Sequence, residues 1–423
     1  MSQLWNDVLV AVKRKRPSGK HTMDKRHCSE TQPTDADYGL KIVATQDAIV
    51  AARSGADNSK IALDGRSTSP GREVFDNSDD YDRQRAEVVR RERVLGFEHA
   101  CTKSASKEEI RANEILQRLR EYDNERVYKK ADLRTGHGGQ RHPRVPGDHF
   151  LSNVELIRET EVFKVARHMP KGAHLHIHFN SCLQPKVLLE VARSMERMFI
   201  KSNMPLVPDD DYVNYERCEI QFSIVKEGEE KPGNLFDRNY TEWQTMQIGE
   251  FLKAFPEKHP YATGGFEWLE RKLQFSEDDA HSKLQTSYGA WEKFNGRTRM
   301  MKGLFNYESA YRTYTQALLQ DFEDDNIQYA EIRPNFMKSN QLTTDNGEDG
   351  IDNFGIMDII IEEYRKFQKK PGGRSFAGLK VIYCTPRSFS NELVKYALDE
   401  CIKFKTRWPE WIAGTLLPPL SPK

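Results

Sequence analysis

The chain has 423 residues, long enough for one large α/β domain with an extension or for two to three ordinary domains. Its 64 Lys and Arg are balanced by 64 Asp and Glu, which excludes a dedicated nucleic-acid binder, and no run approaches the roughly 18 apolar residues of a membrane span. Charged residues make up 30% and hydrophobic residues 37%, a polar composition that predicts a polar extension and an incomplete core.

The first stretch, residues 1–83, has many polar residues and turn formers and no sustained apolar period, which predicts a disordered tail. A basic run, Lys13–Arg16, is a candidate nuclear-import or anionic-surface patch, but a solvated tail is the simpler and preferred interpretation. In MSQLWNDVLVAVKRKR the positive charges follow the apolar residues, whereas a secretory signal has them first. A cytoplasmic location is therefore expected by default.

Residues 84–150 have the composition of a helical N-terminal extension. Ser106 and Glu109 fit a capping box at the start of a helix. Four apolar residues follow roughly on one helical face, among many Glu and Arg: Ile110, Ile115, Leu116 and Leu119. Because this stripe is too small to fold by itself, the extension is expected to pack on another surface.

The following part of the chain, residues 151–414, combines helical and strand patterns. A helix is predicted over 151–169, with Ser152 and Glu155 as its capping box, and the apolar period then changes from near 3.6 to 2. Further strands are expected at 328–336, 378–386 and 411–417, with helices at 354–370 and 390–408. This succession is typical of βαβ units, so the predicted fold class is α/β with a parallel sheet. A polar, proline-bearing insertion at about 204–236 precedes the second strand.

Three histidines occupy alternating positions where the strand period begins. In a regular strand His174, His176 and His178 face one side, and Leu175 and Ile177 face the other. Neighbouring histidines are then roughly 6.6 Å apart, so two imidazoles can bind one metal ion, whereas three would span about 13 Å. At most two of them are expected to be ligands, and ordinary half-buried strand histidines are the alternative.

The sequence around these histidines, MPKGAHLHIHFNSC, resembles the metal-binding opening of the adenosine deaminase family, above all its growth-factor type and their fungal relatives. The resemblance extends through PGDHFLSN, TEVFKVARHMPKG, the segment Trp291–Phe294 and DFEDDNIQYAEIRPNF, and it covers roughly residues 84–414. It implies a (β/α)8 TIM barrel with one Zn²⁺ at the carboxyl ends of its strands. It matches His176 and His178 to two zinc ligands, and His174 to a position that is usually apolar.

The resemblance also implies a reaction, in which adenosine and water give inosine and ammonia. Zinc activates the water for attack at purine C6, and a glutamate of a His-Ala-Gly-Glu motif donates the proton. Trp291 matches an aromatic wall of the substrate pocket, with a buried core tryptophan as the alternative. Glu331 and Arg333, on the strand expected at 328–336, are interpreted as a structural ion pair rather than as substrate contacts.

The sequence departs from the family's pattern at two places. Phe179 and Asn180 stand where relatives often have an acidic residue, which bears on the ribose contact and not on the metal. After Gly414 the chain continues with an atypical tail, residues 415–423, and neither a His-Ala-Gly-Glu motif nor a late Asp-Asp pair occurs in the sequence. We therefore expect a partial (β/α)8 barrel of about four strands, a truncated product that is inactive as written and whose catalytic residues lie beyond it.

Three hypotheses follow from the sequence. The first is a zinc-dependent adenosine aminohydrolase, of which this chain is an incomplete version. The second is a non-catalytic binding or dimerisation protein, with a homodimer formed through the N-terminal helices. The third is a deaminase of another purine. No nucleic-acid or membrane partner is expected, and the location stays open between cytoplasmic, by default, and extracellular, by analogy with the family.

Overall fold

The computed structural model describes residues 78–136, 138–208, 212–260, 262–371, 373, 375–386 and 389–416. Most of the predicted disordered tail therefore lies outside the described residues, as do Lys13–Arg16 and most of the atypical tail. Contacts divide the chain into two compact units, Met1–Asn113 and Glu114–Lys423. Among the described residues, no helix is both long enough and apolar enough to span a membrane.

The described part of the first unit is helical. Its helices are α3 (Ser78–Leu95), α4 (Phe97–Ser104) and the start of α5 (Lys107–Arg126). Residues 78–83, which the sequence assigned to the disordered tail, form the beginning of α3. The capping box predicted for α5 is confirmed: the Glu109 N–H donates to Ser106 Oγ at 3.2 Å, and the Ser106 N–H donates to Glu109 Oε2 at 2.8 Å.

The helix predicted over 151–169 is two helices, α6 (Phe150–Glu159) and α7 (Glu161–His168). The buried carboxylate of Asp123 stabilises the break, because it accepts the backbone N–H groups of the first two residues of α7 at 2.8 and 3.0 Å. Ser152 is not the predicted helix cap. It lies inside α6, and its hydroxyl donates to Glu277.

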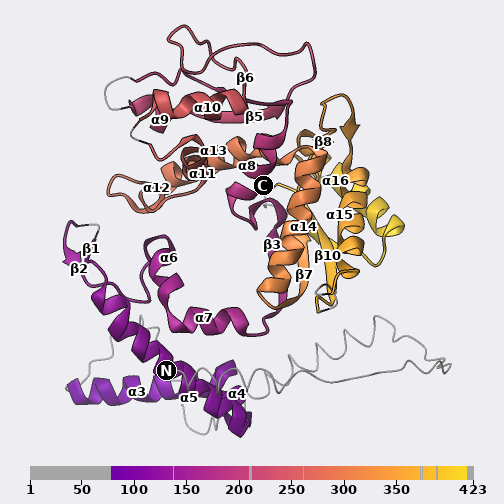
Figure 1. The fold of residues 1–423 in the computed structure, drawn as a ribbon. Coiled ribbons are helices and arrows are strands. Elements are labelled where there is room, and N and C mark those ends of the chain that lie inside the picture. The colour runs from indigo at the N-terminus through magenta and orange to yellow at the C-terminus, as the bar shows by residue number, and fades with distance from the viewer. Residues whose placement is uncertain are drawn as a thin grey trace, which may run out of the picture. The chain divides into compact units, whose positions relative to one another are not determined.

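The strands expected from the sequence form a four-stranded parallel sheet in the order β11-β10-β7-β3. Their bounds are β3 (Gly172–His178), β7 (Ile327–Arg333), β10 (Gly378–Cys384) and β11 (Ile412–Leu416). The predicted intervening helices are confirmed as α15 (Asn353–Gln368) and α16 (Asn391–Arg407). Figure 1 shows α14 (Glu308–Asp324) and α15 alongside this sheet. The α/β class with a parallel sheet is therefore confirmed.

The sheet has a buried face and an open face. Residues of β7 and β10 that face the helices are buried, and we call them the helix face: Ala330, Ile332, Leu379, Val381 and Tyr383. The alternate residues of the same strands are only half-buried, and we call them the open face: Tyr329, Glu331, Lys380, Ile382 and Cys384. This alternation is the period-2 pattern of a sheet packed on one side.

Between β3 and β7 lies an antiparallel sheet that the sequence did not predict. Its strands, in the order β5-β4-β6, are β4 (Met198–Ser202), β5 (Ile220–Ile224) and β6 (Met246–Gln247). The helices of this region are α8 (Pro185–Ser194), α9 (Val213–Arg217), α10 (Ile248–Lys258), α11 (Gly265–Leu273), α12 (Glu277–His281) and α13 (Ser287–Phe305). At Gly303 of α13 a Cβ would lie 1.6 Å from the Phe222 carbonyl oxygen, so only glycine permits this close packing on β5.

Short elements complete the described chain. Two small antiparallel pairs are β1 (Arg134–Thr135) with β2 (Arg141–His142), and β8 (Leu342–Thr343) with β9 (Gly350–Ile351). Single 3₁₀ turns are η1 (Tyr128–Lys130), η2 (Phe179–Ser181) and η4 (Lys338–Asn340). Of these, η2 is important for the site because it directly follows the histidines of β3.

Candidate active site

Strand β3 contains a β-bulge near its centre. His174 pairs with Ala330 of β7, and Ile177 pairs with Ile332, so β3 has one residue more than β7 between these two pairs. An extra residue of this kind is left without a ladder partner and reverses the side-chain alternation on one side of it. The bulge therefore decides which histidines of β3 face the same way.

His176 and His178 are both exposed on the open face of β3, while Ile177 between them packs against the core. The two ring centroids are 5.8 Å apart and the ring planes are inclined by 59°. Because a zinc–nitrogen bond is about 2.1 Å long, imidazoles at this separation can bind one ion between them. The pair offers two nitrogen ligands at the carboxyl end of the first parallel strand.

His174 does not share this face, and the prediction that all three histidines lie on one side is wrong. The His174 ring lies 6.2 Å from the ring of Phe322 in α14, centroid to centroid, on the helix side of the sheet. Leu175, which was expected opposite the histidines, is instead 55% exposed. Both differences have one cause, since the bulge shifts the alternation by one residue.

The ion pair predicted between Glu331 and Arg333 is not formed. Glu331 accepts the hydroxyl of Tyr329 at 2.8 Å. Arg333 is 7% exposed, and its Nη1 donates to the carbonyl oxygen of Leu175 at 3.0 Å. Glu331 and Arg333 are two residues apart on β7 and therefore lie on the same face, but each side chain bonds to a different partner.

Partial desolvation of its ring lowers the pKa of His178 below its ordinary value of 6.5, and the nearby charges of His176 and Arg333 lower it further. A lower pKa favours the neutral imidazole near pH 7. The neutral form has the free lone pair that a metal ion requires, so this environment suits a ligand.

The pair does not complete a metal centre by itself. Among the described residues, no group of three or more His, Cys, Asp or Glu side chains is arranged to hold a metal ion. Catalytic zinc generally has three protein ligands and a water. The histidines that follow β3 in sequence have other neighbours: His259 stacks on Tyr212 at 4.3 Å, and His281 stacks on His149 at 4.0 Å. His176 and His178 thus fit two positions of a zinc site in chemistry and spacing.

A pocket of about 1290 Å³ begins one residue after His178. Its lining comes from the segment after β3, from helices α6, α11 and α13, and from the segment after β7. These two segments follow the carboxyl ends of neighbouring parallel strands, where ligand sites of α/β proteins usually lie. The pocket thus lies beside the histidine pair, although neither His176 nor His178 is among its lining residues.

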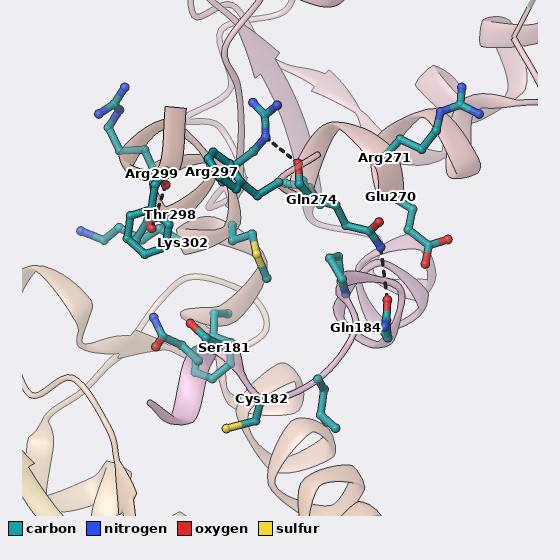
Figure 2. A pocket seen from close by; sticks show the side chains of 18 of the residues that line it. Ser181, Cys182, Gln184, Glu270, Arg271, Gln274, Arg297, Thr298, Arg299 and Lys302 are labelled. Carbon is teal, nitrogen blue, oxygen red and sulfur yellow. Dashed lines mark hydrogen bonds between the residues drawn. The ribbon is translucent and has the colours of Figure 1, made fainter. Parts of the chain in front are cut away.

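Polar side chains line this pocket from several elements (Figure 2). The Gln274 amide donates to Gln184 Oε1 at 3.2 Å, and Arg297 Nε donates to the Gln274 carbonyl oxygen at 2.8 Å. Burial lowers the pKa of Lys302, and no carboxylate pairs with this lysine within the described part of the chain. Sequence reasoning missed these residues because they are far apart in the chain and follow no spacing rule.

The segment that leaves β3 is held rigidly at the pocket wall. The Tyr314 hydroxyl accepts the backbone N–H groups of Cys182 and Leu183 at 3.0 and 2.9 Å. Burial raises the pKa of the Cys182 thiol to about 12, and its Sγ donates to the His178 carbonyl oxygen at 3.1 Å. Cys182 is therefore a structural thiol rather than a nucleophile.

Trp291, predicted as an aromatic wall of the substrate pocket, lies on α13 with 58% of its surface exposed. It is neither buried in the core nor one of the lining residues of the pocket. Phe294, whose ring lies 5.6 Å from that of Trp291 at an angle of 22°, does line the pocket. Phe305 of the same helix lines the pocket as well.

Comparison with known proteins relates the chain to deaminases. No family model matches the chain. Adenosine deaminase 2 of Sus scrofa is 24% identical over 340 residues, which cover 80% of this chain and 59% of that protein. Adenosine deaminase of Phlebotomus duboscqi is 22% identical over 272 residues, covering 64% and 46%. Among solved structures, Arabidopsis ADAL complexed with IMP is 14% identical, covers 61% of this chain and 52% of that chain, and has a TM-score of 0.32.

These matches confirm the resemblance seen in the sequence: the chain is similar to the adenosine deaminases of the growth-factor type. The similarity lies in the amino-acid sequence and extends over 63–80% of the chain. The chain spans about half the length of the curated relatives it matches, from 43% to 59%.

Proposed function

We propose that the protein is a zinc-dependent purine deaminase that converts adenosine and water to inosine and ammonia. The observation that carries the proposal is the pair of His176 and His178 at the end of the first parallel strand, in a sequence similar to adenosine deaminases. Four consecutive parallel strands with helices on one face are also what half of a (β/α)8 barrel requires. We therefore assign this chain to the first four strands of such a barrel.

In this function the two imidazoles would hold zinc through their ring nitrogens, and the lowered pKa of His178 favours the neutral form of its ring, which a metal ligand requires. The bound metal supplies Lewis-acid chemistry and an activated water at the carbon that carries the amino group. The pocket after β3 would receive the nucleoside, and its lining offers the ring of Phe294 for stacking and the amides of Gln184 and Gln274 for hydrogen bonds. Amide side chains suit this role because they both donate and accept hydrogen bonds.

We propose further that these 423 residues by themselves do not deaminate adenosine at an enzymatic rate. Two imidazoles without a third protein ligand bind zinc weakly compared with a complete catalytic site. The sequence has no His-Ala-Gly-Glu motif to supply the proton donor, and general acid–base catalysis typically contributes about 10²–10⁴-fold. Either deficit is sufficient to leave turnover very low.

Zinc binding by the purified chain tests the site directly. Equilibrium dialysis should show zinc bound by the chain and lost from the His176→Ala and His178→Ala variants. His174→Ala is the matched control, because His174 lies on the helix side of the same strand. Zinc retained equally by all three variants would refute the assigned site.

The ultraviolet change on deamination tests the activity. The 423-residue chain is compared with a fusion that adds the C-terminal half of a relative, using adenosine, adenine and AMP as substrates. The fusion should deaminate adenosine and the chain should not. Preference for AMP or adenine would favour the deaminase of another purine, and a chain as fast as the fusion would contradict the proposed inactivity.

A second candidate function, dimerisation through the N-terminal helices, is favoured by exposed apolar side chains on α3 and α4. Val88, Leu95 and Phe97 are 57%, 81% and 84% exposed. Apolar side chains this exposed are typical of a protein interface. Light scattering after size-exclusion chromatography should show a homodimer that dissociates in Leu95→Glu/Phe97→Glu. A monomeric parent chain would exclude this interface.

A further inference from the structure

At the centre of β3 an apolar side chain is exposed to solvent and a polar side chain is half-buried, the reverse of the usual arrangement. Leu175 is 55% exposed, whereas the polar ring of His174 lies half-buried against Phe322. If β3 were regular and kept its pairing of His178 with Arg333, Leu175 would face the helices and His174 would join the other histidines. The bulge is what reverses the two positions.

Hydrophobic burial favours the regular strand over the bulged one. Removing the bulge would move Leu175 out of water and return the His174 imidazole to it, and both changes are favourable by transfer. A bulge also leaves its extra residue without a ladder partner. Some other interaction must therefore stabilise the bulged register.

The structure offers one such interaction, the hydrogen bond from Arg333 to the bulge. Arg333 Nη1 donates to the Leu175 carbonyl oxygen at 3.0 Å, across the bulge from the residue it pairs with, His178. Carbonyls of a regular strand point along the sheet to neighbouring strands, whereas the Arg333 side chain stands on its face. The bond therefore suits a carbonyl that the bulge has freed from the ladder.

Arg333 in turn depends on this carbonyl. The side chain is 7% exposed, its Nε has no hydrogen-bond partner, and no carboxylate pairs with it among the described residues. A buried guanidinium with so few partners is costly unless the remaining contact is kept. Losing the bulge would remove that contact, so the two features stabilise each other.

We propose that Arg333 is a positioning residue that holds β3 in the bulged register and thereby selects His176 and His178 as the metal pair while excluding His174. The inference rests on the proposed function in one respect: the proposed function supplies the metal ion that His176 and His178 bind. Without Arg333, β3 is expected to adopt the regular register, in which His174, His176 and His178 share one face.

The test counts imidazoles bound to Cu²⁺–iminodiacetate by electron paramagnetic resonance on the full chain. Two histidines on one strand face complete the copper coordination together, whereas a single histidine gives a one-imidazole signal. All variants carry His281→Ala, because the stacked rings of His149 and His281 offer another pair. A variant that also lacks His176 and His178 measures the contribution of the remaining histidines.

His178→Ala distinguishes the two registers. With Arg333 present it should lose the two-imidazole signal, because His174 faces the helices. Adding Arg333→Met should restore the signal, because His174 and His176 then share a face. Arg333→Gln should behave as Arg333→Met does, since its shorter side chain falls short of the Leu175 carbonyl. Lys380→Met, which removes a cation from the open face of β10, should restore nothing.

Each outcome has a defined meaning. If the parent, which has both His176 and His178, gives no two-imidazole signal, the proposed metal pair is refuted. The register is then measured by labelling His174 with diethylpyrocarbonate. That labelling should increase in Arg333→Met and Arg333→Gln. An unchanged one-imidazole signal in both double variants, with the helical circular dichroism kept, would overturn the role of Arg333. Loss of that helical signal in both would also overturn it, by showing that Arg333 supports the whole sheet.

Discussion

The helix face and the open face of the parallel sheet are determined by different interactions. On the helix face of β10, Leu379, Val381 and Tyr383 are buried at strictly alternating positions. On β3 the alternation is broken, and His176 and His178 are exposed next to a bulge. The residues of the helix face are determined by apolar burial, which the alternation of apolar residues in the sequence reveals. The residues of the open face are determined by polar contacts between strands, which cannot be predicted from the spacing of residues along one strand.

The largest expected effect on stability lies on the helix face. Phe404→Ala should lower the free energy of unfolding by about 3–5 kcal/mol, because it leaves a cavity in a close-packed core. Phe404 is fully buried, with ring contacts to Phe336 at 5.2 Å and to Tyr383 at 5.6 Å. Urea unfolding measures the change. Ile402→Ala on the same helix, 55% exposed, is the control and should change stability by less than about 0.5 kcal/mol.

A smaller effect is expected where the helix face contains a polar group. The Tyr383 hydroxyl donates to Glu400 Oε2 at 2.6 Å, and the Asn353 amide donates to the same oxygen at 2.7 Å. Tyr383→Phe removes one donor from a buried carboxylate and should cost about 1–3 kcal/mol in urea unfolding. Tyr396→Phe is the control, because Tyr396 is half exposed on α16, the helix that carries Glu400, and this substitution should cost little. Equal losses in the two variants would show that the buried bond contributes nothing.

Much of the fold could be predicted because its strands and helices have the period that burial requires. The strands expected at 328–336 and 378–386 and the helix expected at 390–408 agree with β7, β10 and α16 within a few residues. The antiparallel sheet was missed because its strands are short: β4 directly precedes the polar, proline-bearing insertion, and β5 lies within it. The break between α6 and α7 was missed because Asp123, which stabilises it, is distant in sequence.

The sequence predicted individual residues of the site but not the contacts between them. The positions of His176 and His178 on one face followed from spacing and from the resemblance, since alternation holds downstream of the bulge. The orientation of His174 could not be predicted, because it depends on Arg333, a residue of another strand. The ion pair expected for Glu331 failed for the same reason: its partner is Tyr329, a choice that depends on side-chain reach rather than on charge pattern.

Alkaline pH should distinguish buried tyrosines from exposed ones. Burial raises the pKa of Tyr311 well above its ordinary value of 10. The native state therefore keeps its proton where the unfolded state loses it. Stability is complete below pH 10 and falls above it, by up to about 1.4 kcal/mol per pH unit for each such group. Urea midpoints measured between about pH 9 and 11 should fall less steeply in Tyr311→Phe.

The control for this slope is Tyr288→Phe, because Tyr288 is 73% exposed. It should leave the pH dependence as it is in the parent chain. Tyr329 on the open face is an intermediate case, since burial and Glu331 raise its pKa to about 12. A slope that is the same in all variants would show that the alkaline loss comes from other groups.

The smallest expected effect is the titration of His178 on the open face. Burial, His176 and Arg333 lower its pKa below 6.5, so the folded state favours the neutral ring. The sign for stability follows: the contribution is present above pH 6.5 and is lost as the pH falls through the lowered value, because the unfolded chain takes up the proton first. Nuclear magnetic resonance of the ring protons should give the pKa directly.

His176→Asn and Arg333→Gln should each raise the pKa of His178 toward 6.5, because each removes a nearby positive charge. Lys380→Met should leave it unchanged, since Lys380 is not among the charges that shift this ring. His176→Asn separates burial from charge, because it leaves Arg333 and the register of β3 in place: if the pKa of His178 stays low in this variant, the charge of His176 contributes little. If Arg333→Gln has the larger effect, the buried guanidinium also favours the neutral form of the His178 ring. The open face would then be organised by one arginine that no periodicity in the sequence identifies.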